Sequence, residues 1–152
     1  PALKTEMKRS VNREWFARTP KVMLFTEYPL RNLDKTLLVI NIHGINYVPS
    51  YMLERQLRQA EDKILNHVGP VIFAGDFNAW TKKKTLFMNK FLTNLGFEEV
   101  IFPNGNDRMR AKVTGRFLDF IWLKGLNYHD SYVWGQLKGS DHKALSAIVS
   151  LK

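Results

Sequence analysis

Six polar residues stand at the end or in the middle of apolar, strand-like stretches of the sequence: His43, Asp76, Asn78, Asp119, Asp141 and His142. Carboxylates and imidazoles can transfer protons or bind cations, and an amide can donate a neutral hydrogen bond. Taken singly, each residue also has a structural interpretation as a turn former, a loop cap or half of a salt bridge. Taken together, they favour one functional site.

Asp119 is the most informative of these residues. The stretch RFLDFIWL places its carboxylate among large apolar side chains. An unpaired buried charge is strongly destabilising, so Asp119 needs a partner. His43 ends the apolar stretch LLVINIH and also calls for a partner or a function. Its case is weaker, because a single histidine at a strand end is more often structural than catalytic.

The elements that must position these residues alternate between strand-like and helix-like patterns. Residues 21–30 and 35–44 are rich in aliphatic residues and are separated by RNLD, which predicts a hairpin. Residues 50–67 predict one amphipathic helix with Ser50 as its N-cap. Its expected inward face consists of Leu53, Leu57, Ala60 and Ile64.

The second half of the chain continues this alternation. GPVIFAGD (69–76) predicts a short buried strand, and residues 82–97 predict a helix that Gly96 ends. The inward residues of this helix are expected to be Phe87, Phe91, Leu92 and Leu95. Further strands are expected at 116–123, 130–134 and 144–151, whereas the charged segment 8–16 is assigned no strand.

Composition indicates one globular domain over residues 1–152, since 45% of the residues are hydrophobic and 24% are charged. The absence of cysteine excludes disulfides and thiolate metal sites. No apolar stretch approaches the roughly 18–20 residues of a membrane span, and the basic N-terminus lacks the apolar core of a signal peptide. A cytoplasmic protein is expected. Because the chain begins with Pro1, a processed or truncated product is also expected.

The charge balance favours polyanionic partners. Lysine and arginine number 23 against 14 acidic residues, which leaves a net charge of +9. Nucleic acid, phospholipid headgroups and phosphorylated small molecules all remain open. The cluster TKKKT (81–85), Arg108 and Arg110 can be read either as solvated surface or as phosphate contacts.

Four motifs carry a resemblance to a known superfamily: NIHG (41–44), GDFNAW (75–80), RFLDFIWL (116–123) and GSDHKAL (139–145). In this order the chain resembles the endonuclease/exonuclease/phosphatase superfamily, which includes pancreatic deoxyribonuclease, apurinic endonucleases, sphingomyelinases and inositol polyphosphate phosphatases. The resemblance implies an α/β fold, a four-layer sandwich of two mixed sheets flanked by helices. It also implies that the motifs converge at one edge.

The activity implied by the resemblance is metal-dependent hydrolysis of phosphoesters, most simply by a nuclease or phosphodiesterase that uses Mg²⁺ (or Mn²⁺). Asp76 would orient or deprotonate the attacking water. Asn78 would donate a hydrogen bond to a phosphate oxygen, and His43 would contact the phosphate. The spacing of Asp76 and Asn78 allows both side chains to reach one pocket from the end of a strand.

The resemblance assigns the other polar residues to proton transfer and metal binding. His142 would be the general base or a phosphate-contacting imidazolium, and Asp119 would be its buried orienting partner. Asp141 would bind the metal or its waters, together with Asp76. A phosphatase or phosphodiesterase acting on inositol phosphate or phospholipid headgroups, a catalytically inactive phosphate-binding module and a purely structural domain remain alternatives.

The front of the chain departs from the family pattern. Members have an asparagine and a metal-binding glutamate at strand ends well before the position of His43. Asn12 lies in a charged segment, and Glu27 in the expected hairpin is too close to His43 to match. The chain is therefore expected to be the C-terminal part of a longer protein that lacks N-terminal strands. Residues 1–152 alone are expected to bind Mg²⁺ weakly, to hydrolyse little, and to self-associate or pair with the missing segment.

Overall fold

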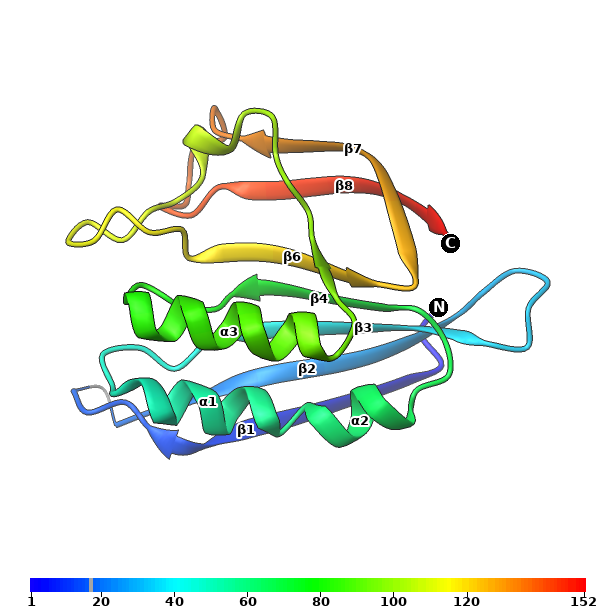
Figure 1. The fold of residues 1–152 in the computed structure, drawn as a ribbon, viewed down its shortest axis with the longest axis horizontal. Helices are drawn as coiled ribbons and strands as arrows, with labels where there is room; N and C mark the ends of the chain where they lie inside the picture. The colour runs from blue at the N-terminus through cyan, green and yellow to red at the C-terminus, as the bar shows by residue number, and fades with distance from the viewer. Residues whose placement is uncertain (17) are drawn as a thin grey trace.

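The computed structural model describes residues 1–16 and 18–152, which form two β-sheets and three α-helices (Figure 1). The larger sheet is mixed and has the order β1-β2-β3-β4-β6-β5. Its strands are β1 (Lys4–Arg13), β2 (Pro20–Pro29), β3 (Thr36–His43), β4 (Val71–Asp76), β6 (Asp119–Lys124) and β5 (Glu98–Glu99). The smaller sheet is an antiparallel pair, β7 (Leu126–Trp134) and β8 (Ala144–Leu151).

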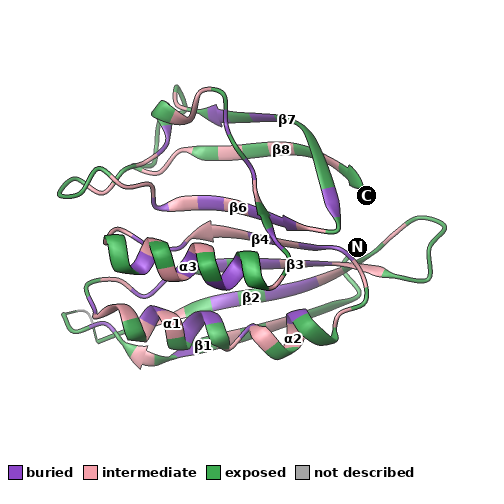
Figure 2. Ribbon diagram, in the orientation of Figure 1, coloured by how far each residue is buried: buried purple, intermediate pink, exposed green. Residues whose placement is uncertain are grey.

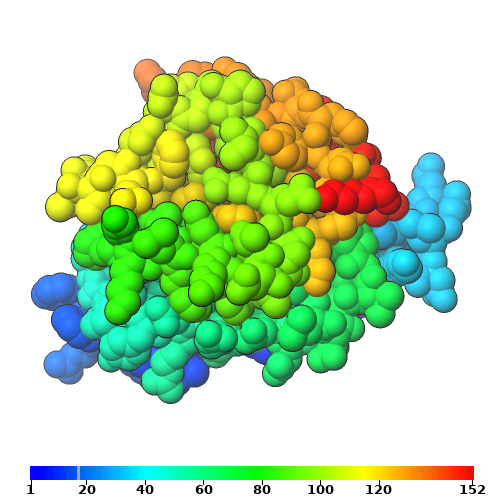
Figure 3. All heavy atoms as spheres, viewed as in Figure 1, coloured from blue at the N-terminus to red at the C-terminus, as the bar shows by residue number. Residues whose placement is uncertain are grey.

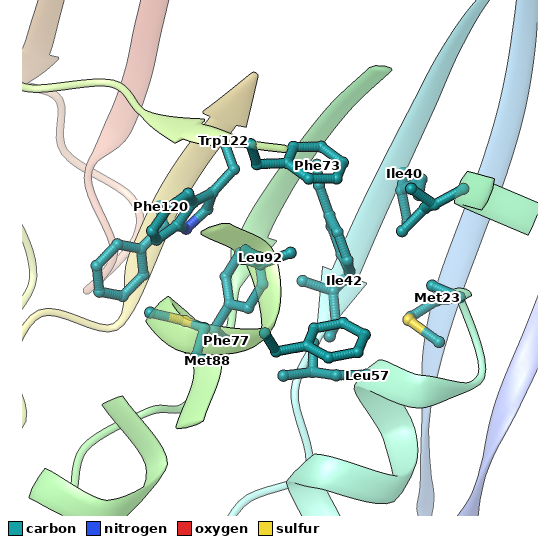
Figure 4. Packing of buried hydrophobic residues seen from close by; sticks show 14 of the residues in the cluster. Met23, Ile40, Ile42, Leu57, Phe73, Phe77, Met88, Leu92, Phe120 and Trp122 are labelled. Carbon is teal, nitrogen blue, oxygen red and sulfur yellow. The ribbon is translucent and has the colours of Figure 1, made fainter. Parts of the chain in front are cut away.

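The helices cover one face of the larger sheet (Figure 1). They are α1 (Ser50–Arg58), α2 (Glu61–Asn66) and α3 (Lys82–Asn94), and a short 3₁₀ helix spans Gly105–Asp107. Between helices and sheet lies the main core, where Ile42, Phe73 and Trp122 from the strands meet Leu57 and Leu92 from the helices (Figure 4). Fully burying one such side chain contributes about 1.5–3 kcal/mol. In the described part of the chain, no helix combines the length and apolar character needed to cross a membrane.

The β7–β8 hairpin packs on the opposite face of the larger sheet. Leu145, Ala147 and Val149 of β8 pack against the same buried cluster as Ile72 of β4 and Ile121 of β6. The hairpin does not cover the same face of β1 and β2. There Met7, Val22, Leu24 and Tyr28 remain 55%, 37%, 40% and 39% exposed. Figure 2 shows the resulting contrast between the buried centre of the large sheet and its exposed β1 side.

The predicted fold class is confirmed. The structure is α/β, with two sheets packed face to face and helices flanking the larger one. The expected hairpin corresponds to β2 and β3, the strand at 69–76 to β4 and the strand at 144–151 to β8. One detail differs from the expected pair of mixed sheets, because the smaller sheet is purely antiparallel. Within the described residues, the helices pack on the larger sheet.

The predicted single helix over 50–67 is wrong in one respect, because the segment forms two helices. The N–H groups of Gln59 and Ala60 bond to carbonyls three residues back, which tightens the backbone and ends α1. Ser50 is not the N-cap either, since Pro49 holds that position without a side-chain hydrogen bond. The four residues expected to face inward are nevertheless fully buried: Leu53, Leu57, Ala60 and Ile64.

The N-terminal segment was wrongly assigned no strand. Residues Lys4–Arg13 form β1, which pairs antiparallel with β2, and Asn12 is its next-to-last residue. β1 is one of the two edge strands of the sheet. Edge strands commonly carry charged side chains that discourage pairing with other molecules. The charged sequence of β1 lacks the alternation of apolar and polar residues that identifies a strand. It therefore resembles the sequence of a solvated loop.

Candidate active site

Three strands bring their polar residues to one edge of the larger sheet. β3 and β4 are parallel, with His43 opposite Asp76, and β4 pairs antiparallel with β6, with Asp76 opposite Asp119. β3 and β4 end at this edge and β6 begins there, at the left of the sheet in Figure 1. His142, two residues before β8, reaches the same edge and contacts Asp119.

The contact between His142 and Asp119 is the shortest ionisable pair of the site. Nδ1 of His142 lies 3.0 Å from Oδ1 and 2.9 Å from Oδ2 of Asp119. Burial raises the pKa of Asp119 to about 6, although the neighbouring imidazole opposes this shift. Partial burial acts to lower the pKa of His142, but the carboxylates of Asp119, Asp76 and Asp141 together outweigh it, so the pKa is raised overall. The strand carboxylate therefore has the partner that its burial requires.

Asp76 is held by the residue two positions further on. The backbone N–H of Asn78 donates to Oδ1 of Asp76, and its side-chain Nδ2 donates to Oδ2, both at 2.8 Å. The same Nδ2 donates to the carbonyl of Gly44 at 2.9 Å. Asn78 is 2% exposed and has a φ of 48°, a conformation that asparagine tolerates better than most residues. Burial raises the pKa of Asp76, and the N–H of Asn78 opposes this shift.

Asn78 was expected to donate a hydrogen bond to a phosphate oxygen, but its side-chain amide has other acceptors in the structure. Both hydrogens of its side-chain amide are already donated within the protein. In this arrangement Asn78 orients the Asp76 carboxylate and ties the end of β4 to the residue after β3. Donation to a phosphate would require one of these bonds to be exchanged.

His43 lies at the solvent side of the same edge. Its Nε2 is 3.8 Å from Oδ2 of Asp76, and its side chain is 51% exposed. Burial lowers the pKa of His43, and the charge of Lys21 lowers it further, against the opposing effect of Asp76. A neutral imidazole is therefore favoured here near neutral pH.

Asp141 and the expected metal site are less well defined. Asp141 is exposed, and its charge contributes to raising the pKa of His142. Within the described residues, no group of three or more histidine and acidic side chains is placed to hold a metal ion. Mg²⁺ commonly binds through only one or two carboxylates, with water and substrate phosphate completing its shell. The charges of Asp76 and Asp141 both raise the pKa of His142, so both carboxylates lie near this imidazole.

Glu27 takes no part in the site. It pairs with Leu38 in the β2–β3 register, five residues from His43, and lies 3.5 Å from Nζ of Lys63. Glu14, just after β1, is instead near the site edge. It is 7% exposed, accepts a hydrogen bond from the N–H of Asn46 at 3.0 Å and pairs with Lys21 at 3.5 Å. Sequence reasoning missed Glu14 and Lys21, because their position depends on the unrecognised pairing of β1 with β2.

Two basic residues left open between solvated and phosphate-binding roles are buried instead. Lys84 is 1% exposed, its Nζ lies 5.3 Å from the centroid of the Trp80 ring, and burial lowers its pKa to about 8. Arg108 is 7% exposed and stacks its guanidinium 4.1 Å from the Phe117 ring centroid. It also donates to the backbone carbonyl of Asp119, so it supports the strand that carries this carboxylate.

A pocket of about 420 Å³ opens beside the candidate active site. Asn78 and Asp141 line it on the side of the site, and Tyr47, Trp80 and Val113 contribute apolar surface. Figure 3 shows the yellow loop that precedes β6 lying next to the green start of α3 at this end of the molecule.

A family model described as "Endonuclease/Exonuclease/phosphatase family" matches residues 6–142 of the chain. Among curated proteins, a UPF0294 protein of Klebsiella pneumoniae is 39% identical over 134 residues, which are 88% of this chain and 49% of that protein. A UPF0294 protein of Yersinia enterocolitica is 37% identical, with 88% and 50% covered. The chain thus spans about half the length of the curated relatives it matches.

Solved structures share the fold at low sequence identity. An endonuclease/exonuclease/phosphatase of Bacteroides vulgatus has a TM-score of 0.73 at 14% identity, covering 100% of this chain and 66% of that one. A mannosyl-6-phosphatase of Bacteroides thetaiotaomicron has a TM-score of 0.67 at 14% identity, with 99% and 67% covered. D. rerio TDP2, solved with a single strand DNA product, has a TM-score of 0.68 at 17% identity, with 98% and 68% covered.

Proposed function

Because this chain belongs to the endonuclease/exonuclease/phosphatase family, we propose that the protein is a divalent-metal-dependent phosphodiesterase. The observation that carries the proposal is the pairing of His142 with Asp119 beside the Asp76 carboxylate. Three ionisable groups with shifted pKa values at one edge of a sheet are typical of a hydrolytic centre.

Proton transfer is assigned to His142. Since Nδ1 is bonded to Asp119, Nε2 is the nitrogen that exchanges a proton with water or substrate. Asp119 fixes the ring orientation and stabilises the imidazolium when it forms. In its neutral form His142 is a general base, and in its protonated form it offsets the charge of the phosphate. The pH dependence of kcat/KM separates these roles, since activity rises with pH in the first case and falls in the second.

Asp76, His43 and Asn78 act on the other reactants. Asp76 orients the attacking water, His43 contacts the phosphate as a neutral donor, and Asn78 holds Asp76 in position. Mg²⁺ or Mn²⁺ would be held by Asp76 and Asp141 and would supply neutralisation of charge on the non-bridging phosphate oxygens.

For the substrate, we favour the backbone of a nucleic acid. The net charge of +9 supports a polyanion, and TDP2, a protein of the same fold, was solved with a DNA product. Phosphatase or phosphodiesterase activity on inositol phosphates or phospholipid headgroups is the second candidate, supported by the shared fold with a mannosyl-6-phosphatase.

The test is hydrolysis of bis-para-nitrophenyl phosphate by the full-length protein, with Mg²⁺, with Mn²⁺ and with a chelator. His142→Ala and Asp76→Ala should each lower kcat by about a hundredfold or more, with a smaller effect on KM. His129→Ala and Asp34→Ala are matched controls, because both residues are exposed and lie outside the site. Near-normal turnover in either site variant contradicts the role given to that residue.

A further inference from the structure

The pocket beside the candidate active site has features that the proposed hydrolysis does not use. Its volume of about 420 Å³ is in the range of pockets that hold small ligands, roughly 300–1,000 Å³. Asn78 and Asp141 place it directly against the site, while Met109, Val113 and Leu118 line it with apolar side chains. A ligand whose phosphate is at the site therefore has room for an apolar group in this pocket.

One wall of the pocket is an indole ring that is fixed before any ligand binds. The Nε1–H of Trp80 donates to Oδ1 of Asn46 at 2.8 Å, and its carbonyl accepts a hydrogen bond from Oγ1 of Thr114 at 2.6 Å. The ammonium of Lys84 lies 5.3 Å from the ring centroid. An aromatic surface that is already ordered loses little entropy when a ligand packs on it.

Tyr47 extends this wall outward. It is 61% exposed, and its φ of 49° is unfavourable for a residue with a large side chain. Its N–H donates to the same Oδ1 of Asn46 that holds Trp80. The Tyr47 ring centroid lies 6.4 Å from that of Trp80 and 6.3 Å from that of Phe16, which is 84% exposed. The three rings form an aromatic row that leads from the pocket to solvent.

We propose that this aromatic row and pocket bind unpaired nucleobases next to the reacting phosphate, so that the substrate is single-stranded nucleic acid. The inference rests on the proposed phosphodiesterase function. Every base has an aromatic face that stacks on such rings, whereas the bases of a duplex are stacked on one another. Lys112 in the pocket lining and the net charge of +9 complement the phosphate backbone. Acyl chains would match the apolar lining but not the ordered aromatic faces.

Binding of two fluorescently labelled oligonucleotides to the full-length protein tests the inference. Their fluorescence anisotropy is measured in the presence of a chelator. One is a single-stranded thymidine oligomer, and the other is an abasic oligomer of the same length and charge. The thymidine oligomer is expected to bind at least about tenfold more tightly. Tyr47→Ala should reduce this preference severalfold. Tyr28→Ala is the matched control, because it removes a partly exposed tyrosine from the opposite end of the sheet.

Val113→Asp provides a second variant, because this pocket residue is 91% exposed and its replacement leaves the core intact. It should also weaken binding of the thymidine oligomer. Equal affinity for both oligomers, or a preference unchanged in both variants, overturns the inference. Cleavage of bis-para-nitrophenyl phosphate is measured in parallel. Cleavage without base preference contradicts the pocket assignment alone, and base-dependent binding without cleavage contradicts the proposed hydrolysis alone.

Discussion

At the scale of single residues, the contact between Asp119 and His142 controls the protonation of the imidazole. Asp119→Asn keeps the shape of the side chain and removes the negative charge that raises the His142 pKa. The pKa of His142 should therefore fall in this variant, because the protonated ring loses its main stabilising partner. NMR titration of the histidine ring protons measures the shift directly.

The matched control for this measurement is Asp130→Asn, which changes an exposed aspartate of β7 outside the site. It should leave the titration of His142 unchanged. A His142 pKa that stays the same or rises in Asp119→Asn would show that the carboxylate is not the group that holds the proton on the ring.

The partnership of Asp119 could be anticipated from sequence, whereas the contacts of Asn78 could not. An aspartate inside RFLDFIWL must find a counterpart, and a histidine follows in the SDH motif. Asn78 instead donates to Gly44, 34 positions earlier in the chain, a contact that depends on the alignment of β3 with β4. Lys84 gave no sign of burial either, because it stands in a run of three lysines.

At the scale of elements, the close approach of β3 and β4 positions Asp76. Gly75 has a φ of +131°, and a Cβ at this position would lie 2.2 Å from the carbonyl oxygen of Ile42. Gly75→Ala should lower the free energy of unfolding by about 1–3 kcal/mol from its backbone conformation alone. Urea denaturation followed by circular dichroism measures this loss.

Gly105→Ala is the control for that substitution. A Cβ on Gly105 would meet its nearest neighbours at 3.8 and 3.9 Å, which are ordinary contacts. Its stability should change by no more than about 0.5 kcal/mol. Equal stability of the two variants would contradict this prediction. It would mean that the backbones of β3 and β4 move apart to accommodate the added methyl group without loss of stability.

Elements with a clear apolar pattern in their sequence were predictable, and those without one were not. β4 and β8 were recognised by their apolar residues, and α3 by its spacing and its terminating Gly96. β1 was missed because one of its edges is solvated and its sequence is highly charged. The break between α1 and α2 was missed because the inward positions continue in phase across it.

At the scale of the whole molecule, the uncovered outer face of β1 and β2 is expected to cause self-association. Apolar side chains on this face and an open β1 edge offer a surface for a second copy. Leu24→Lys should weaken association of residues 1–152 by about tenfold or more, because it places a charge in the middle of that surface. Sedimentation equilibrium over a range of concentrations measures the change.

Leu86→Lys serves as the control for this substitution. Leu86 is 59% exposed on α3, which covers the other face of the sheet. Its replacement should leave association unchanged. A chain that stays monomeric at every concentration, or an equal effect of both variants, would exclude the outer face as the contact surface.

The separate β7–β8 hairpin has a consequence for how the candidate active site responds to heating. Within the described residues it forms its own sheet, held to the larger one by side-chain packing rather than by a shared ladder. Regions held in this way can open locally at a lower free energy than global unfolding. Such opening carries His142 away from Asp119 while β3, β4 and β6 remain paired. The amides of β8 should therefore exchange with deuterium faster than those of β4, and the proposed hydrolysis should fade below the temperature at which the sheet melts.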